Sequence, residues 1–202
     1  TEVQTCALPI SGSRVNLEYY FAETLRLCSN ENIEILRRAL FALGRFEYVV
    51  DSSILREALD FIKAAAARKN DDILLANVVD VASELLRKDE SLISEATRVI
   101  DCALEKGRDN SLYAASYLFG IRYEKIPEST VDILLKHLRR VNPDHLKTLD
   151  NIDYGVAELL KGEKREDGIQ FLEDILLINE GKIALEIFNS TILLLRSEER
   201  RV

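Results

Sequence analysis

Apolar residues recur along this chain at the helical spacing of three to four residues, and almost every segment shows the pattern. The spacing predicts helices at about residues 16–28, 32–48, 53–69, 72–88, 90–106, 109–123, 128–141, 144–161, 165–179 and 182–195. Short polar links separate them, so the predicted fold class is all-α. Short helices joined by tight links build either a bundle or a solenoid, in which helix pairs stack in a row.

Residues suited to helix ends stand at most of these links. The predicted N-terminal caps and first-turn residues are Asn30, Asp51, Ser52, Asn70, Asp89, Asp109, Pro127, Pro143 and Asp144. Gly107, Gly162 and Gly181 follow predicted helix ends, where a left-handed backbone is expected.

Internal repetition favours the solenoid. One apolar position recurs at steps of 38, 38 and 34 residues, as Ile62, Ile100, Leu138 and Leu172. The intervening helices repeat as well, since the segment that starts at Glu84 as Glu-Leu-Leu-Arg returns 74 residues later, from Glu158, as Glu-Leu-Leu-Lys. The repeat unit is therefore near 37 residues and holds two helices.

This period resembles that of HEAT repeats over residues 32–195, about four and a half units. Tetratricopeptide and ankyrin arrays fit less well, because the chain has no Trp and no TPLH motif. The Pro that many HEAT units carry in their first helix is absent, which leaves a variant helical-repeat family open. The resemblance implies an α-solenoid of stacked antiparallel helix pairs, with four to five HEAT-like repeats and an armadillo-type shape.

Both ends of the chain resemble translated short-read sequencing adapters. The codons GTT CAG ACG TGT GCT CTT CCG ATC T give residues 3–10 and begin that of Ser11, and AGA TCG GAA GAG CGT CGT GT gives residues 196–201 and begins that of Val202. The chain also contains no Met. We therefore expect non-native tails at 1–11 and 196–202 around a helical-repeat domain at 12–195, truncated at both ends, whose true termini and any signal peptide lie elsewhere.

Composition and motifs argue against several functions. The chain has 27 Lys and Arg against 35 Asp and Glu, a net charge of −8, which disfavours nucleic-acid backbones and anionic membranes as partners. No apolar run approaches the roughly 20 residues of a membrane span. Cys6, Cys28 and Cys102 lack metal-type spacing, which favours buried reduced thiols and a reducing compartment.

Catalytic signatures are missing too. Nucleotide-binding, metalloprotease and hydrolase motifs do not occur. The acidic pairs, which begin at Asp71, Asp89 and Glu166, fall at predicted helix starts, where the helix dipole explains them. We predict no catalytic, cofactor-binding or metal-binding residue and no cofactor.

Aligning the repeats gives three polar columns. They hold Lys63, Asp101, Arg139 and Glu173; Asp60, Arg98, Lys136 and Gln170; and Arg56, Ser94, Asp132 and Glu166. Signs alternate along the first column, which predicts a salt-bridge ladder between repeats in preference to a charged recognition strip. Neither interpretation provides a basic groove of the kind that follows phosphates.

The histidines and aromatic residues also receive structural interpretations. His137 stands in an otherwise apolar column, so we predict a buried, hydrogen-bonded histidine near Asp101 or Cys102, whereas His145 caps or begins a helix and is expected to be exposed. Helical spacing predicts core packing, in preference to a base-stacking platform, for Tyr19, Tyr20, Phe41, Phe46, Tyr48, Tyr113, Tyr117, Phe119 and Tyr123.

The leading functional hypothesis is a protein-interaction or scaffold region of a larger cytoplasmic protein, without catalysis of its own. The alternative is a nucleic-acid-binding or DNA-glycosylase-like enzyme, because some HEAT-like proteins resemble DNA glycosylases. That alternative needs a basic groove and a catalytic acid near aromatic residues, and the net charge argues against it. A small-cofactor lyase or chaperone has no supporting residue.

Apolar residues at both predicted ends of the array generate a first prediction. Tyr19, Tyr20 and Phe21 in the first predicted helix, and the apolar residues between Ile183 and Leu195 in the last one, form faces that stacking neighbours would cover. We expect this chain to self-associate through those faces, with a molar mass in light scattering that rises with concentration. A constant monomer mass at high concentration would contradict the prediction.

Overall fold

The computed structural model describes residues 17–48, 53–68, 70–121, 126–180, 182–183 and 187–199. Within these residues it contains ten α-helices, the short 3-10 helix η2, a further residue in 3-10 conformation at Ile187 and no strand, so the predicted all-α class is confirmed. The elements are α1 (Leu17–Cys28), α2 (Ile33–Leu43), α3 (Ser53–Arg68), α4 (Asp72–Lys88), η2 (Glu90–Leu92), α5 (Ile93–Lys106), α6 (Asp109–Ile121), α7 (Glu128–Leu138), α8 (Leu146–Lys161), α9 (Arg165–Ile178) and α10 (Asn189–Glu199). Of the predicted adapter-like tails, residues 1–11 and 200–202 lie outside the described residues, and residues 196–199 continue α10.

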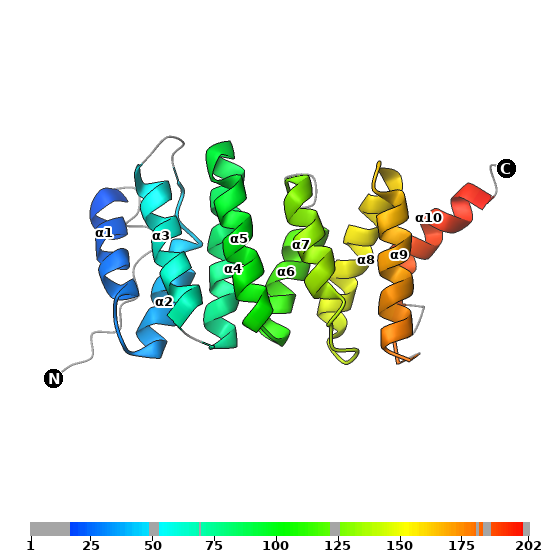
Figure 1. Ribbon diagram of the computed structural model, residues 1–202, viewed down its shortest axis with the longest axis horizontal. Coiled ribbons are helices and arrows are strands. Elements are labelled where there is room, and N and C mark those ends of the chain that lie inside the picture. Colours follow the sequence, from blue (N-terminus) through cyan, green and yellow to red (C-terminus); the bar gives the residue numbers. More distant parts are fainter. Residues whose placement is uncertain are drawn as a thin grey trace.

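The helices lie side by side in two layers along the long axis of the molecule (Figure 1). The even layer consists of α2, α4, α6, α8 and α10, each of which contacts the next. The odd layer contains α1, α3, α5 and α7, which also contact one another in order, and α9, which packs on α8 at the C-terminal end of the row. Helices of the two layers pack together as α3 on α4, α5 on α4 and α6, and α7 on α6.

The core runs between the two layers. Helix α4 shows why, since it contacts α2, α3, α5 and α6 and has nine buried residues. Leu74, Val78 and Leu85 among them are fully buried. Because α4 has neighbours on several sides, its apolar residues must cover more than one face of the helix. None of the described helices is long and apolar enough to cross a membrane.

Most predicted helices are confirmed, and the differences fall at their ends. Helix α2 ends at Leu43, five residues before the predicted end, and the Tyr48 hydroxyl donates to the Leu43 carbonyl at 2.9 Å across the following turn. Helix α10 begins at Asn189 and not near 182. Ile183 and Phe188 ahead of it are buried outside any α-helix, and Ile187 between them is in 3-10 conformation, so the apolar character of Ile183 and Phe188 reflects packing and not an α-helix.

The caps are also partly corrected. Asn32 caps α2 in place of Asn30, and Asp71 caps α4 in place of Asn70 through a bond from the Leu74 N–H at 2.9 Å. Asp89 caps η2 as predicted. Gly107 and Gly162 do end α5 and α8, but their backbones are extended and not left-handed. Asp51, Ser52 and Gly181 lie outside the described residues.

Side chains of the even layer fasten each helix to its neighbour. Asp72, in the first turn of α4, accepts hydrogen bonds from the backbone N–H groups of Arg108, Asn110 and Ser111 at the start of α6. Asp153 of α8 likewise accepts hydrogen bonds from the backbone N–H groups of Ser190 and Thr191 at the start of α10. Each carboxylate therefore satisfies free N–H groups of a neighbouring helix and fixes its position along the row.

Two glycines let α6 and α8 approach closely. A Cβ at Gly120 would overlap the backbone of Asn151, and a Cβ at Gly155 would overlap the ring of Phe119. Phe119 is fully buried, so its ring has no free space into which it can move.

We expect Gly155→Ala to lower the free energy of unfolding by about 1–3 kcal/mol, because overpacking forces α6 and α8 apart. Gly162→Ala is the matched control, since its Cβ would meet only carbonyl oxygens, the nearer of them Leu159 O at 3.8 Å. Urea unfolding followed by circular dichroism measures both variants. Equal stabilities of the two variants would contradict the close approach.

Asp72→Ala leaves three N–H groups at the start of α6 without their carboxylate partner. We expect a loss of about 1–2 kcal/mol in unfolding free energy, as for other lost helix caps. Asp60→Ala, on the exposed side of α3, provides the control and should change stability little. A similar loss in both variants would show that Asp72 does not fasten α6.

Candidate functional site: the exposed face of the even layer

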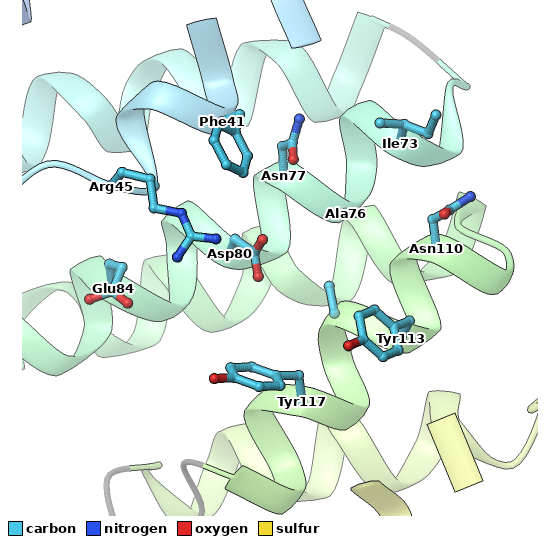
Figure 2. Close-up of a pocket in the computed structure, with 12 residues that line it drawn as sticks. Phe41, Arg45, Ile73, Ala76, Asn77, Asp80, Glu84, Asn110, Tyr113 and Tyr117 are labelled. Carbon is cyan, nitrogen blue, oxygen red and sulfur yellow. The ribbon is translucent and has the colours of Figure 1, made fainter. Parts of the chain in front are cut away.

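The outer face of the even layer contains a hollow of about 450 Å³ over α4. Its lining comes from three successive even helices and the turn after α2 (Figure 2). The lining residues are Phe41, Gly44, Arg45, Ile73, Ala76, Asn77, Asp80, Glu84, Asn110, Tyr113, Ala114 and Tyr117. We call this site the α4 hollow.

Helix α4 supplies the largest share of the lining. Asn77, Asp80 and Glu84 are spaced by three and four residues and so project from one side of the helix. The Asn77 amide donates to the Arg37 carbonyl of α2 at 2.9 Å, which fastens this side of α4 to the neighbouring helix. Gly44, Ala76 and Ala114 have small or no side chains, and this leaves space above the backbone.

Aromatic side chains from α2 and α6 surround the hollow (Figure 2). Phe41 is 52% exposed, Tyr113 42% and Tyr117 38%. The prediction that these three rings pack in the core is therefore wrong, because they point away from the odd layer. It is also wrong for Tyr19, which is exposed, whereas Tyr48 and Phe119 are buried as predicted, Tyr20 and Phe46 are half-buried, and Tyr123 lies outside the described residues.

The charges of the α4 hollow are mixed. The Arg45 guanidinium lies over the Phe41 ring, 5.0 Å from its centre, and is turned toward the Asp80 side of the hollow (Figure 2). Glu84 forms an ion pair with Arg87 of its own helix. One basic and two acidic side chains line the hollow, so a phosphate backbone would find no basic track there.

A second hollow, of about 410 Å³, lies between α8 and α10 on the same layer. Its lining residues are Tyr154, Ala157, Glu158, Lys161, Ser190, Leu193 and Leu194. The Glu158–Lys161 ion pair, at 2.5 Å, occupies the positions 74 residues after Glu84–Arg87. Asn151 of α8 likewise reaches back to Ser116 of α6 at 3.1 Å, as Asn77 reaches back to α2.

The odd layer carries the predicted ladder of ion pairs, with different partners. Lys63 meets Glu95 at 2.9 Å, and Arg139 meets Asp174 at 2.8 Å. The ladder therefore joins neighbouring odd helices as expected, but not along a single column. Lys136 meets Asp101 at 3.0 Å, and Lys164 meets Asp132 at 2.5 Å. These pairs make Lys63, Asp101, Lys136, Arg139 and Asp132 of the predicted columns structural contacts.

Both histidines lie where the sequence predicts. His137 is 4% exposed, and its Nε2 lies 2.6 Å from Asp101 Oδ1. His145 precedes α8, is exposed, and lies 3.8 Å from Asp109. Neither arrangement includes a nucleophile or a third ligand.

The cysteines and acidic pairs show no reactive arrangement. Cys28 and Cys102 are free and half-buried, Cys6 lies outside the described residues, and burial raises the pKa of the Cys28 thiol to about 12. The hydrogen bond from Arg37, together with the one from the Leu74 N–H, lowers the pKa of Asp71, although burial opposes the shift. Within the described residues no group of three or more His, Cys, Asp or Glu is placed to hold a metal ion.

In comparisons with protein-family models, curated proteins and solved structures, the chain matches none. The structure offers two surfaces of different character, an ion-paired odd layer and an even layer with exposed aromatic rings around a hollow. The second has the chemistry of a binding surface.

Proposed function

We propose that this chain is a HEAT-like α-solenoid region of a larger cytoplasmic protein, and that it binds another protein through the even layer without catalysis of its own. The observation that carries the proposal is the exposure of Phe41, Tyr113 and Tyr117 around the α4 hollow. Aromatic residues are enriched at the anchoring points of protein interfaces, where each contributes a large apolar area.

The repeat assignment has its own support. Asn77 and Asn151 stand 74 residues apart and both bond to the preceding even helix. The ion pairs of Glu84 and Glu158 are spaced in the same way. Two periods of 37 residues account for both spacings, and the two-layer row is what stacked helix pairs produce.

The mechanism we propose is recognition by a stiff surface that presents side chains from several helices at once. The α4 hollow and the hollow between α8 and α10 are centred about two and a half helix spacings apart, roughly 25 Å. An extended peptide rises about 3.3 Å per residue, so roughly seven or eight residues would separate two side chains that fill both hollows. A partner in this conformation gains affinity because the surface is already ordered.

We expect peptides selected from a random displayed library against this chain to lose at least about tenfold in affinity with Tyr117→Ala, and again with Tyr113→Ala. Fluorescence anisotropy with the best selected peptide measures the loss. Leu177→Ala on α9 is the control, because Leu177 is 76% exposed but belongs to the odd layer. Thermal melts of all variants separate lost binding from lost folding.

The same chain distinguishes the alternative of a nucleic-acid-binding or glycosylase-like enzyme. Binding to a labelled DNA duplex that is tight in low salt and weakens steeply as salt rises would overturn the proposal. A library selection that enriches no peptide, or peptides whose binding ignores Tyr113 and Tyr117, would contradict it as well.

A further inference from the structure

One titratable side chain lies inside the packed odd layer. His137, in the last turn of α7, is 4% exposed and faces α5. Its Nε2 lies 2.6 Å from the Asp101 carboxylate of α5. On the other side of the ring, Nδ1 lies 3.2 Å from Nη2 of Arg140, which also donates to the Leu104 carbonyl of α5 at 2.5 Å.

The partners of the ring determine its protonation state. A guanidinium has only donors, so Nδ1 must accept a hydrogen bond from Arg140. A carboxylate has only acceptors, so Nε2 must carry the proton and donate to Asp101. The imidazole is therefore neutral, and α5 and α7 are joined by the continuous series Asp101, His137, Arg140 and Leu104.

Protonation of His137 breaks this series at one point. The added proton sits on Nδ1 and points at the donors of Arg140, so that bond is lost and two positive charges face each other. Asp101 already accepts the Nε2–H bond, so it gains attraction but no new hydrogen bond. Arg140 can relieve the contact only by moving away from Nδ1, and this movement weakens its bond to Leu104.

The surrounding charges add to this effect. Lys136, next to His137 on α7, contacts the same Asp101 oxygen at 3.0 Å and shares its negative charge. Other acidic and basic groups on α5 are directed elsewhere: Glu95 to Lys63, Arg98 to Ser94, and Lys106 to α3, while Glu105 is exposed. Asp109 is the only charged side chain of α6 and lies near His145, and Asp174 of α9 accepts from Arg139.

We propose that His137 is a pH-sensitive latch between α5 and α7, closed while the imidazole is neutral and released when the ring is protonated. The proposal does not rest on the function proposed for the even layer, because none of its residues lines the α4 hollow.

The direction of the pH dependence follows from the environment of the ring. Burial, and then the charges of Arg140 and Lys136, hold the pKa of His137 below its ordinary 6.5, although Asp101 acts in the opposite direction. When the contact between α5 and α7 opens, the His137 ring regains its ordinary pKa and binds a proton more readily than in the closed contact. The closed contact between α5 and α7 therefore loses stability as the pH falls below 6.5. Burial acts to raise the pKa of Asp101, but the bonds from His137 and Lys136 together hold that pKa below 3.8, so the carboxylate stays charged in this window.

The first experiment is a proton and nitrogen NMR titration of the His137 ring in the His145→Gln variant, which leaves one histidine. We expect the Nε2–H tautomer and a midpoint below 6.5. Arg140→Gln should raise that midpoint, because it removes the opposing charge. An Nδ1–H tautomer, or a midpoint at or above 6.5, would overturn the latch.

Hydrogen exchange measures the release itself. Between pH 7.5 and pH 5.0, and after correction for intrinsic rates, amides of α7 and of the end of α5 should exchange faster. The limit is about tenfold for each unit by which the pKa of His137 lies below 6.5. His137→Gln should abolish the change, whereas His145→Gln should retain it. A pH response that persists in folded His137→Gln would overturn the proposal, and if that variant does not fold, the titration decides alone.

Discussion

The structure depends on how each even helix is fixed to the next. Packing of apolar faces alone allows neighbouring helices to slide, because leucine and valine contacts have little direction. The carboxylates of Asp72 and Asp153 remove that freedom, since each accepts directed hydrogen bonds from the first N–H groups of the following even helix. The register of α4 and α6 then brings Tyr113 and Tyr117 together with Asp80 around one hollow. The arrangement of the side chains around the α4 hollow is thus a consequence of helix caps that lie on a different helix from the one they cap.

Local sequence signals predict the helices well, because amphipathic spacing and capping residues are properties of neighbouring residues in the chain. Asp72 is a residue whose role such local signals do not predict. The acidic pair of Asp71 and Asp72 predicts a helix start, and Asp71 does cap α4, but the Asp72 side chain serves α6 across the row. Likewise, Ile183 and Phe188 fall in a segment whose apolar spacing resembles a helix, yet both are buried outside any α-helix. A partner 37 or 38 residues away cannot be identified from local spacing.

The ion pairs between odd helices and the aromatic rings around the α4 hollow show what the periodicity of the sequence can predict and what it cannot. Sign alternation predicts ion pairs between repeats, but the observed partners are 32 to 36 residues apart and not 38, because long side chains reach obliquely to the next helix. In α6 the difficulty is greater, since Leu112, Tyr113, Leu118 and Phe119 make it apolar on nearly every side. Its inward face is decided by Gly155, which receives Phe119 and so leaves Tyr113 and Tyr117 outward.

The two layers consequently have different roles in the molecule. In the odd layer, many acidic and basic side chains hold neighbouring helices together. We propose that the contact between α5 and α7 weakens at low pH, when His137 is protonated. In the even layer, aromatic rings remain at the surface although their burial would stabilise the fold. The helices that carry the α4 hollow rest on the odd helices, α4 on α5 and α6 on both α5 and α7. The distance between α5 and α7 therefore affects the distance between the helices α4 and α6 that rest on them. A looser contact between α5 and α7 would alter the α4 hollow, although no residue of that contact lines it.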